Sequence, residues 1–293
     1  MCKMERGLPQ MATSRTQIDQ TNSQRRWVVG AVSFLNTKPL IDGLDRQPGI
    51  TLKLAVPAEL PALLEADQAD AVLVPAVDFG RNRPDWHIIS DGCIASDGQT
   101  MTVRIFSRVP PDRITTLHVD GDSHTSVVLA QVLWRRLYER ALPVRRIDTR
   151  REPLDRCQAV LLIGDKVVSG PTRQFGFEVD LGGAWKQLTG LPFVFAVWAG
   201  KRHSDLGQLP QLLDAARDRG VGRAAELAKV HGPANGWPVE LAAKYLTQYL
   251  SFALTPRHHR GLELFFEMAE QMGLLRASPG DLAVANQPAE HQP

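Results

Sequence analysis

Cysteine is scarce in this sequence, which has three cysteines among 293 residues. Cys2, Cys93 and Cys157 are widely spaced, and no Cys-x-x-Cys pair occurs. The eight histidines are scattered, and the adjacent pair His258 and His259 would point about 100° apart on a helix. These absences argue against a disulfide framework and a metal site, and they favour a reducing compartment.

Long apolar runs are also missing. No window approaches the roughly 18 uninterrupted apolar residues of a membrane-spanning helix. Residues 1–26 are polar and contain nothing like the apolar core of a secretory signal peptide. We therefore expect a protein of the cytoplasm that does not enter a membrane, with disordered tails at 1–26 and 286–293.

The sequence has no large excess of charge of either sign, since its formal net charge is +2. This value argues against nucleic-acid binding, which needs a strongly basic surface. The glycine-rich phosphate-binding motifs are missing too, because neither Gly-x-Gly-x-x-Gly nor a P-loop occurs, and there is no Gly-x-Ser-x-Gly elbow. The common dinucleotide, nucleoside triphosphate and serine-hydrolase sites are therefore not expected.

What is present is an alternation of strands and helices. Short apolar runs rich in β-branched residues predict buried strands at 27–32, 70–75, 102–106, 117–120, 159–165 and 191–199. Helices are predicted from a first turn that contains Pro39, around 60–64 and after 123. After Lys201 the pattern predicts helices alone, near 205–231, 238–252 and 257–274. Strands separated by helices predict an α/β protein with mixed, mainly parallel sheets, whose ligands bind beyond the carboxyl ends of the strands.

Polar side chains follow two of these strands. Between the first strand and the next helix lie Ser33, Asn36 and Thr37, and after the strand at 117–120 come Ser123, Thr125 and Ser126. Hydroxyl groups beside a helix N-terminus are suitable donors for a ligand carboxylate. The alternative is that both segments only cap helices or make turns.

Two further residues lie at strand ends. Asp165 follows a buried strand and is either a cleft residue or the N-cap of the next helix. Thr102 begins an apolar run and is either a cleft hydroxyl or an ordinary strand threonine. The residues alone thus predict an α/β protein with a polar cleft suited to an anion.

Five ordered segments are similar to the chorismate dehydratases that open the futalosine route to menaquinone. The similarity is collinear from about 27 to 275, and it is strongest in the last segment. The segments are VGAVSFLNTKPL at 29–40, CIASDG at 93–98, DSHTSV at 122–127, LLIGD at 161–165 and DLGGAWKQLTGLPFVFAVW at 180–198.

The resemblance implies a type II periplasmic-binding-protein-like fold, with chorismate bound in the cleft between two lobes. It implies a hydro-lyase that forms 3-[(1-carboxyvinyl)oxy]benzoate and water without a metal or an organic cofactor. Chorismate is then the expected partner, with no nucleic acid and no membrane. Asn36 matches the catalytically important asparagine of the family, and Thr102 is the second predicted catalytic residue. The predicted substrate-binding residues are Ser33, Thr37, Ser123, Thr125, Ser126 and Asp165.

The sequence departs from the family pattern at three positions. Thr102 occupies the place of a cleft serine, His124 replaces an arginine, and Lys166 replaces a small apolar residue. These departures keep open a non-catalytic binder or sensor of an aromatic carboxylate. The member of the same fold that makes a dihydroxynaphthoate is a second alternative.

A proline pair and a single proline predict where the chain crosses between the lobes. Pro110 and Pro111 place one crossing near 106–112, and Pro192 places the return near 190–197, because prolines suit connectors rather than central strands. The predicted lobes are therefore 27–108 plus 196–285 and 109–195.

Overall fold

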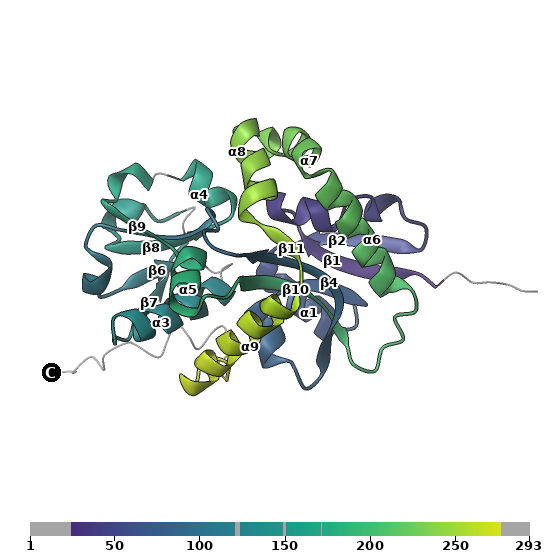
Figure 1. Ribbon diagram of the computed structural model, residues 1–293, viewed down its shortest axis with the longest axis horizontal. Coiled ribbons are helices and arrows are strands. Elements are labelled where there is room, and N and C mark those ends of the chain that lie inside the picture. The colour runs from purple at the N-terminus through teal and green to yellow at the C-terminus, as the bar shows by residue number, and fades with distance from the viewer. Residues whose placement is uncertain (1–24, 121–123, 149–150, 171, 277–293) are drawn as a thin grey trace, which may run out of the picture.

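Two lobes, each built around one β-sheet, lie side by side in the computed structural model (Figure 1). The structure describes residues 25–120, 124–148, 151–170 and 172–276. The predicted tails at 1–26 and 286–293, apart from Arg25 and Arg26, lie outside these ranges, and so does the predicted site residue Ser123. Among the described residues, no helix combines the length and the apolar character needed to cross a membrane.

The larger sheet has six strands in the order β11-β4-β10-β3-β1-β2. The central strands of this sheet are almost wholly apolar because they are covered on both faces, and β3 is buried at every position. The strands are β1 (Trp27–Val32), β2 (Ile50–Ala55), β3 (Ala71–Pro75), β4 (Trp86–Ser96), β10 (Phe193–Lys201) and β11 (Ser251–Ala253).

The smaller sheet has five strands in the order β7-β6-β8-β5-β9. The central strand β8 carries the apolar run that the sequence predicts as a buried strand, and four of its five residues are buried. The strands are β5 (Val103–Ser107), β6 (Leu117–Val119), β7 (Val144–Arg146), β8 (Ala159–Ile163) and β9 (Phe177–Asp180).

Helices cover both sheets, and most of the long ones belong to the second half of the chain (Figure 1). The α-helices are α1 (Leu60–Glu65), α2 (Ala76–Arg81), α3 (His124–Leu137), α4 (Asp165–Ser169), α5 (Leu181–Thr189), α6 (Leu209–Gly222), α7 (Ala224–His231), α8 (Val239–Lys244) and α9 (Pro256–Gln271). Two short segments matter for the site, the 3-10 helix η1 (Leu35–Leu40) and the π-helix η8 (Tyr245–Tyr249). Pro39 lies inside η1, so the helix predicted there is a 3-10 helix.

The lobe boundary predicted at 108 is wrong for the strand β5. This strand pairs antiparallel with β8 and β9 in the smaller sheet, so 103–107 belongs to the second lobe. The chain therefore crosses after β4 ends at Ser96 and before β5 begins at Val103. Pro110 and Pro111 instead lie at the short 3-10 turn that follows β5. The chain returns between the end of α5 and the start of β10.

Two other expectations about the sheets are also wrong. A strand does follow Lys201, because β11 pairs antiparallel with β4. Parallel pairs are not in the majority, since four described strand pairs are parallel and five are antiparallel. The physical reason is the double crossing: β5 and β10 begin where the chain has just changed lobes, and both run against the strands beside them.

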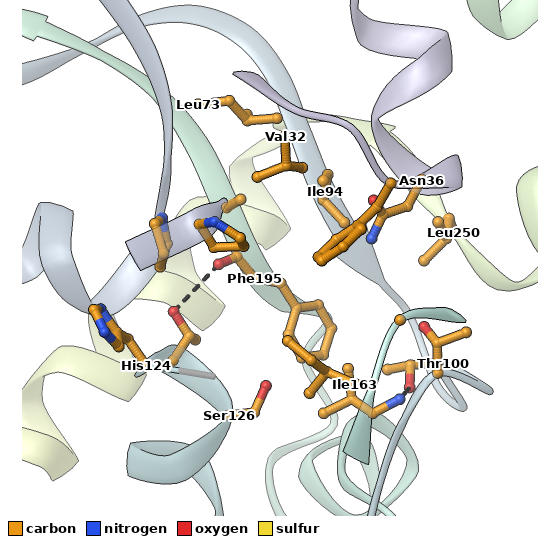
Figure 2. Close-up of a pocket in the computed structure, with 18 of the residues that line it drawn as sticks. Val32, Asn36, Leu73, Ile94, Thr100, His124, Ser126, Ile163, Phe195 and Leu250 are labelled. Carbon is orange, nitrogen blue, oxygen red and sulfur yellow. Dashed lines mark hydrogen bonds between the residues drawn. The ribbon is translucent and has the colours of Figure 1, made fainter. Parts of the chain in front are cut away.

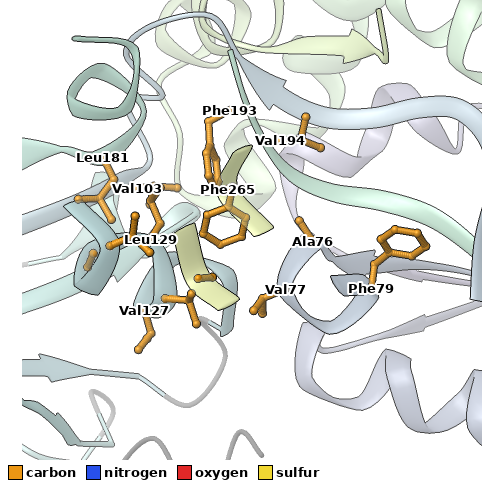
Figure 3. Close-up of a cluster of buried hydrophobic side chains, with 14 of the residues drawn as sticks. Ala76, Val77, Phe79, Val103, Val127, Leu129, Leu181, Phe193, Val194 and Phe265 are labelled. Carbon is orange, nitrogen blue, oxygen red and sulfur yellow. The ribbon is translucent and has the colours of Figure 1, made fainter. Parts of the chain in front are cut away.

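The hydrophobic core is continuous across the lobes. Phe265 of α9 packs edge-on against Phe193 of β10, with ring centroids 5.0 Å apart, and against Trp185 of α5 at 6.2 Å. Figure 3 shows Phe193 and Phe265 between side chains of the smaller lobe, such as Leu181, and side chains of the larger lobe, such as Phe79. The helix α9 therefore packs on both lobes and joins them.

Candidate functional site

A cleft of about 720 Å³, a volume that includes its open mouth, lies between the lobes. Its walls are mainly apolar and carry a few polar groups, which is the usual character of a small-molecule site. The lining residues are Val32, Phe34, Asn36, Pro57, Leu73, Pro75, Ile94, Thr100, Thr102, Val103, His124, Thr125, Ser126, Ile163, Gly164, Phe195, Ala196, Tyr245 and Leu250. Figure 2 shows Asn36 on one side of Phe195 and the helix end with His124 and Ser126 on the other.

Asn36 is placed by the turn from β1 into η1. Phe34 keeps an extended backbone, with φ −64° and ψ 159°, before the 3-10 helix starts at Leu35. Thr37 is fully buried beneath Asn36, and its hydroxyl donates to Asn36 Oδ1 at 3.3 Å. With the amide oxygen occupied by Thr37, the amide nitrogen is the group of Asn36 that can donate to a ligand.

A buried tyrosine completes a polar cluster with Asn36. The hydroxyl groups of Tyr245 and Thr102 are 2.7 Å apart, and both side chains are buried. Burial raises the pKa of Tyr245 well above its usual range, and hydrogen bonds with Thr102 and Asn36 oppose this shift only in part. The Tyr245 hydroxyl therefore stays protonated and is a hydrogen-bond donor rather than a base.

Sequence reasoning missed Tyr245 as a site residue. It is 143 positions from Thr102, and no motif surrounds it. The structural signal is the π-helix that begins at Tyr245, because such segments are frequent at functional sites and are not visible in a periodicity pattern.

His124 is held by Asp78 of α2, which is itself paired with Arg81 of the same helix. Its Nδ1 lies 2.7 Å from Asp78 Oδ2, and Arg81 donates to the other carboxylate oxygen of Asp78 at 3.1 Å. An ionised carboxylate only accepts hydrogen bonds, so Nδ1 carries the proton and Nε2 is the ring nitrogen left for a ligand. Asp78 and His124 come from different lobes, and this pair also joins the lobes at one end of the cleft.

Thr125 and Ser126 have different surroundings, although they are neighbours in α3. The Thr125 hydroxyl accepts from the Val77 backbone N–H at 3.2 Å. It also donates to the Phe195 carbonyl oxygen at 3.3 Å, the bond drawn as a dashed line in Figure 2. Through these two hydrogen bonds the Thr125 hydroxyl links the two lobes. Ser126 is 5% exposed and lines the cleft, and its hydroxyl has no hydrogen-bond partner among the described residues.

The other predicted binding residues lie outside the lining of the cleft. Ser33 is exposed and is not among the lining residues, while Thr37 is hydrogen-bonded to the side chain of Asn36. Asp165 is the first residue of α4 and accepts from Trp237 Nε1 at 2.6 Å. It is not the N-cap of that helix, because Gly164 has the cap position. Lys166 pairs with Asp120.

Few ionisable residues line the cleft. Among the described lining residues there is no Asp, Glu, Lys or Arg, and the ionisable ones are His124 and Tyr245. Within the described ranges, no group of three or more His, Cys, Asp or Glu side chains is placed to hold a metal ion. The cleft can therefore bind an apolar ring and donate hydrogen bonds to it, but it offers no carboxylate base of its own.

Comparisons with known proteins give a family for the chain. A family model described as menaquinone biosynthesis matches residues 27–271. A chorismate dehydratase of Thermus thermophilus is 31% identical over 267 residues, which cover 85% of this chain and 96% of that protein.

Solved structures with the same architecture are more distant in sequence. A protein of Archaeoglobus fulgidus has a TM-score of 0.66 at 16% identity, over 86% of this chain and 99% of that one. The alkanesulfonate-binding protein of Xanthomonas axonopodis pv. citri, bound to MOPS, has a TM-score of 0.62 at 13% identity, over 87% and 95%. The periplasmic aliphatic sulphonate binding protein of Escherichia coli has a TM-score of 0.61 at 12% identity, over 86% and 94%. The fold is therefore periplasmic-binding-protein-like.

Proposed function

This chain belongs to the menaquinone biosynthesis family, and from that premise we propose that it is a chorismate dehydratase. It converts chorismate into 3-[(1-carboxyvinyl)oxy]benzoate and water, in agreement with the activity named for the relative of Thermus thermophilus. The observation that carries the proposal is the cluster of Asn36, Thr102 and Tyr245 in the wall of a mainly apolar interlobe cleft. We place the enzyme in the cytoplasm, where the buried free thiols of Cys93 and Cys157 suit a reducing medium.

The reaction needs little covalent chemistry from the protein. The ring carbon that carries the enolpyruvyl ether loses its proton, and the C–H electron pair forms the new double bond. The adjacent carbon loses its hydroxyl group, which leaves as water after taking up a proton, and the ring becomes aromatic. Since aromatisation drives this elimination, the main tasks of the protein are orientation and hydrogen bonding to the departing oxygen.

The polar cluster serves the departing hydroxyl group. Asn36 donates from its amide, and the hydrogen-bonded pair of Tyr245 and Thr102 supplies a further donor from a buried position in the cleft wall. A donor that meets developing negative charge in a dry pocket acts more strongly than it does in water. Thr102 keeps the hydroxyl group of the family's serine, so its added methyl group only adds to the apolar wall.

The base is a carboxylate of the substrate itself. The described lining offers no Asp or Glu, and the raised pKa of Tyr245, which burial causes, makes this residue a poor base. An intramolecular carboxylate has a high effective concentration at the ring proton. It takes the proton and passes it on to the leaving hydroxyl group.

The other substrate carboxylate binds where α3 begins. Ser126 donates from its unpartnered hydroxyl group, and His124 donates from Nε2 when its ring carries a proton on both nitrogens, with Nδ1 held by Asp78. The N-terminus of α3, a helix of 14 residues, adds a favourable field for an anion. His124 takes over the role of the arginine that the family has at this position.

Ser126→Ala should weaken the binding of chorismate by about tenfold to a hundredfold, because a hydrogen bond to a charged group contributes about 1.5–3 kcal/mol. Calorimetry gives the dissociation constant directly. Ser204→Ala, in a surface turn of the larger lobe away from the cleft lining, is the matched control and should bind as the parent does. Equal affinity of Ser126→Ala and the parent would leave Ser126 as a helix residue without a ligand.

The activity is tested by incubating the purified chain with chorismate. We expect chorismate to disappear and an equal amount of 3-[(1-carboxyvinyl)oxy]benzoate to form without added metal or cofactor. Separation of the two acids by liquid chromatography, with detection of the aromatic product, measures both. A protein that binds chorismate and leaves it unchanged is a sensor, and the proposal of an enzyme then fails.

A further inference from the structure

Asp165 and Trp237 form a contact between the lobes outside the cleft lining. Asp165 begins α4 of the smaller lobe, and Trp237 lies immediately before Pro238 and α8 of the larger lobe. The Trp237 indole N–H donates to Asp165 Oδ1 at 2.6 Å. Trp237 is 3% exposed, so its indole N–H depends on this carboxylate for its hydrogen bond.

The same indole ring is stacked on Tyr245. The ring centroids of Trp237 and Tyr245 are 4.8 Å apart and the ring planes differ by 19°. Tyr245 is 1% exposed and its hydroxyl lies 2.7 Å from that of Thr102 in the cleft wall. An unbroken series of contacts therefore runs from Asp165 through Trp237 and Tyr245 to Thr102 and Asn36.

Asp165 has no other evident structural purpose. It does not cap α4, and its carboxylate has no hydrogen bond to a Lys or Arg side chain among the described residues. Burial raises its pKa, while the hydrogen bond from Trp237 and the charge of Lys38 act against that shift. A desolvated carboxylate costs stability, and such a cost is typical of residues that position a functional site.

We propose that Asp165 and Trp237 are positioning residues for the dehydration, because they set the plane of the Tyr245 ring and thereby the direction of its hydroxyl group toward Thr102 and Asn36. This inference rests on the proposed function. The carboxylate fixes the indole, the indole fixes the phenol ring by stacking, and the phenol oxygen can then meet the leaving group only along one direction. Since Asp165 and Trp237 come from different lobes, the alignment is complete only when the cleft is closed.

The test compares four variants with the parent in chorismate turnover. Asp165→Ala removes the acceptor, and Asp165→Asn keeps an oxygen acceptor at the same place without the charge. Trp237→Phe keeps a stacking ring but removes the indole N–H, and the fourth variant combines Asp165→Ala with Trp237→Phe. Trp134→Phe is the matched control, since it removes an indole bond to the Pro111 carbonyl in the core of the smaller lobe.

Asp165→Ala and Trp237→Phe should each lower kcat by about tenfold to a hundredfold with a much smaller change in KM, because misplaced groups lose transition-state contacts. The double variant should be no slower than the slower single variant, since both substitutions break the same series of contacts. Asp165→Asn should keep kcat within about twofold of the parent, because the neutral amide oxygen still accepts from the indole. Trp134→Phe should keep the parental kcat even where it lowers the melting temperature.

Three results would overturn the inference. Parental kcat in both Asp165→Ala and Trp237→Phe would show that the contact is only structural. A kcat of the double variant that falls by the product of the two single losses would show that the two residues act separately. A raised KM in both Asp165→Ala and Asp165→Asn would make Asp165 a substrate-binding residue. Failure of the proposed function looks different, because the parent itself then leaves chorismate unchanged. In that case the coupling between Asp165 and Trp237 is measured from the free energies of unfolding of the same proteins. Additive effects of the two substitutions on these free energies would contradict the coupling.

Discussion

Asn36→Ala should lower kcat for chorismate by about a hundredfold to a thousandfold, the effect of removing one donor from a transition-state site. KM should change far less, because the apolar walls and the carboxylate contacts that we propose for Ser126 and His124 bind the ground state without Asn36. The substitution also frees the Thr37 hydroxyl that donates to Asn36 in the parent. Steady-state kinetics with chorismate separates the two constants.

Asn36→Asp is the informative companion to this variant. It keeps the shape of the side chain but places a negative charge, which cannot donate, opposite a dianionic substrate. We expect it to lose kcat as Asn36→Ala does and in addition to raise KM. Gln68→Ala, which removes an exposed amide that does not line the cleft, is the control and should behave as the parent. Parental kcat in both Asn36 variants would reduce Asn36 to a turn residue.

Gly220→Ala should destabilise the protein by about 3 kcal/mol, at the upper end of the usual cost of overpacking. Gly220 lies in α6 where this helix packs on η1, and a Cβ at this position would be 2.0 Å from the Pro39 carbonyl oxygen. The obstacle is backbone, so either α6 or η1 must move. Because η1 carries Asn36, the displacement should also lower kcat.

Gly222→Ala in the same helix is the matched control. A Cβ at Gly222 meets nothing within 4 Å, and the position is exposed. This variant should be neutral or more stable by up to about 1 kcal/mol, because alanine is the better helix former. Chemical denaturation of both variants gives the two free energies of unfolding. Equal stabilities would show that the approach of α6 to η1 is loose and does not hold Asn36.

The strands that the sequence predicted best are those whose stability is local. The predicted run at 159–165 contains β8, and the predicted run at 27–32 is β1. Both strands could be predicted because each is buried on both faces and carries an apolar residue at nearly every position. The strand β11 has three residues and is stabilised by its pairing with β4, so no local sequence pattern predicts it. The proline pair at 110–111 misplaced the lobe crossing for a similar reason. Prolines mark a connector, but only pairing decides to which sheet the preceding strand belongs.

The sequence by itself determined those features of the cleft that arise from residues close together along the chain. The turn after β1 placed Asn36, the start of α3 placed Ser126, and the ordered motifs indicated the family before any contact was visible. These signals are local because a strand end and a helix N-terminus are made by neighbouring residues.

Only the tertiary structure decided which side chains complete the site. It brought Tyr245 to Thr102 across 143 positions, gave Thr125 a link between the lobes instead of a free hydroxyl, and turned Asp165 away from the cleft lining toward Trp237. Each of these contacts joins segments that are distant in sequence, and each links the two lobes as they pack in this structure. A contact of that kind depends on the packing of both lobes together, and neither of the two local sequences contains it.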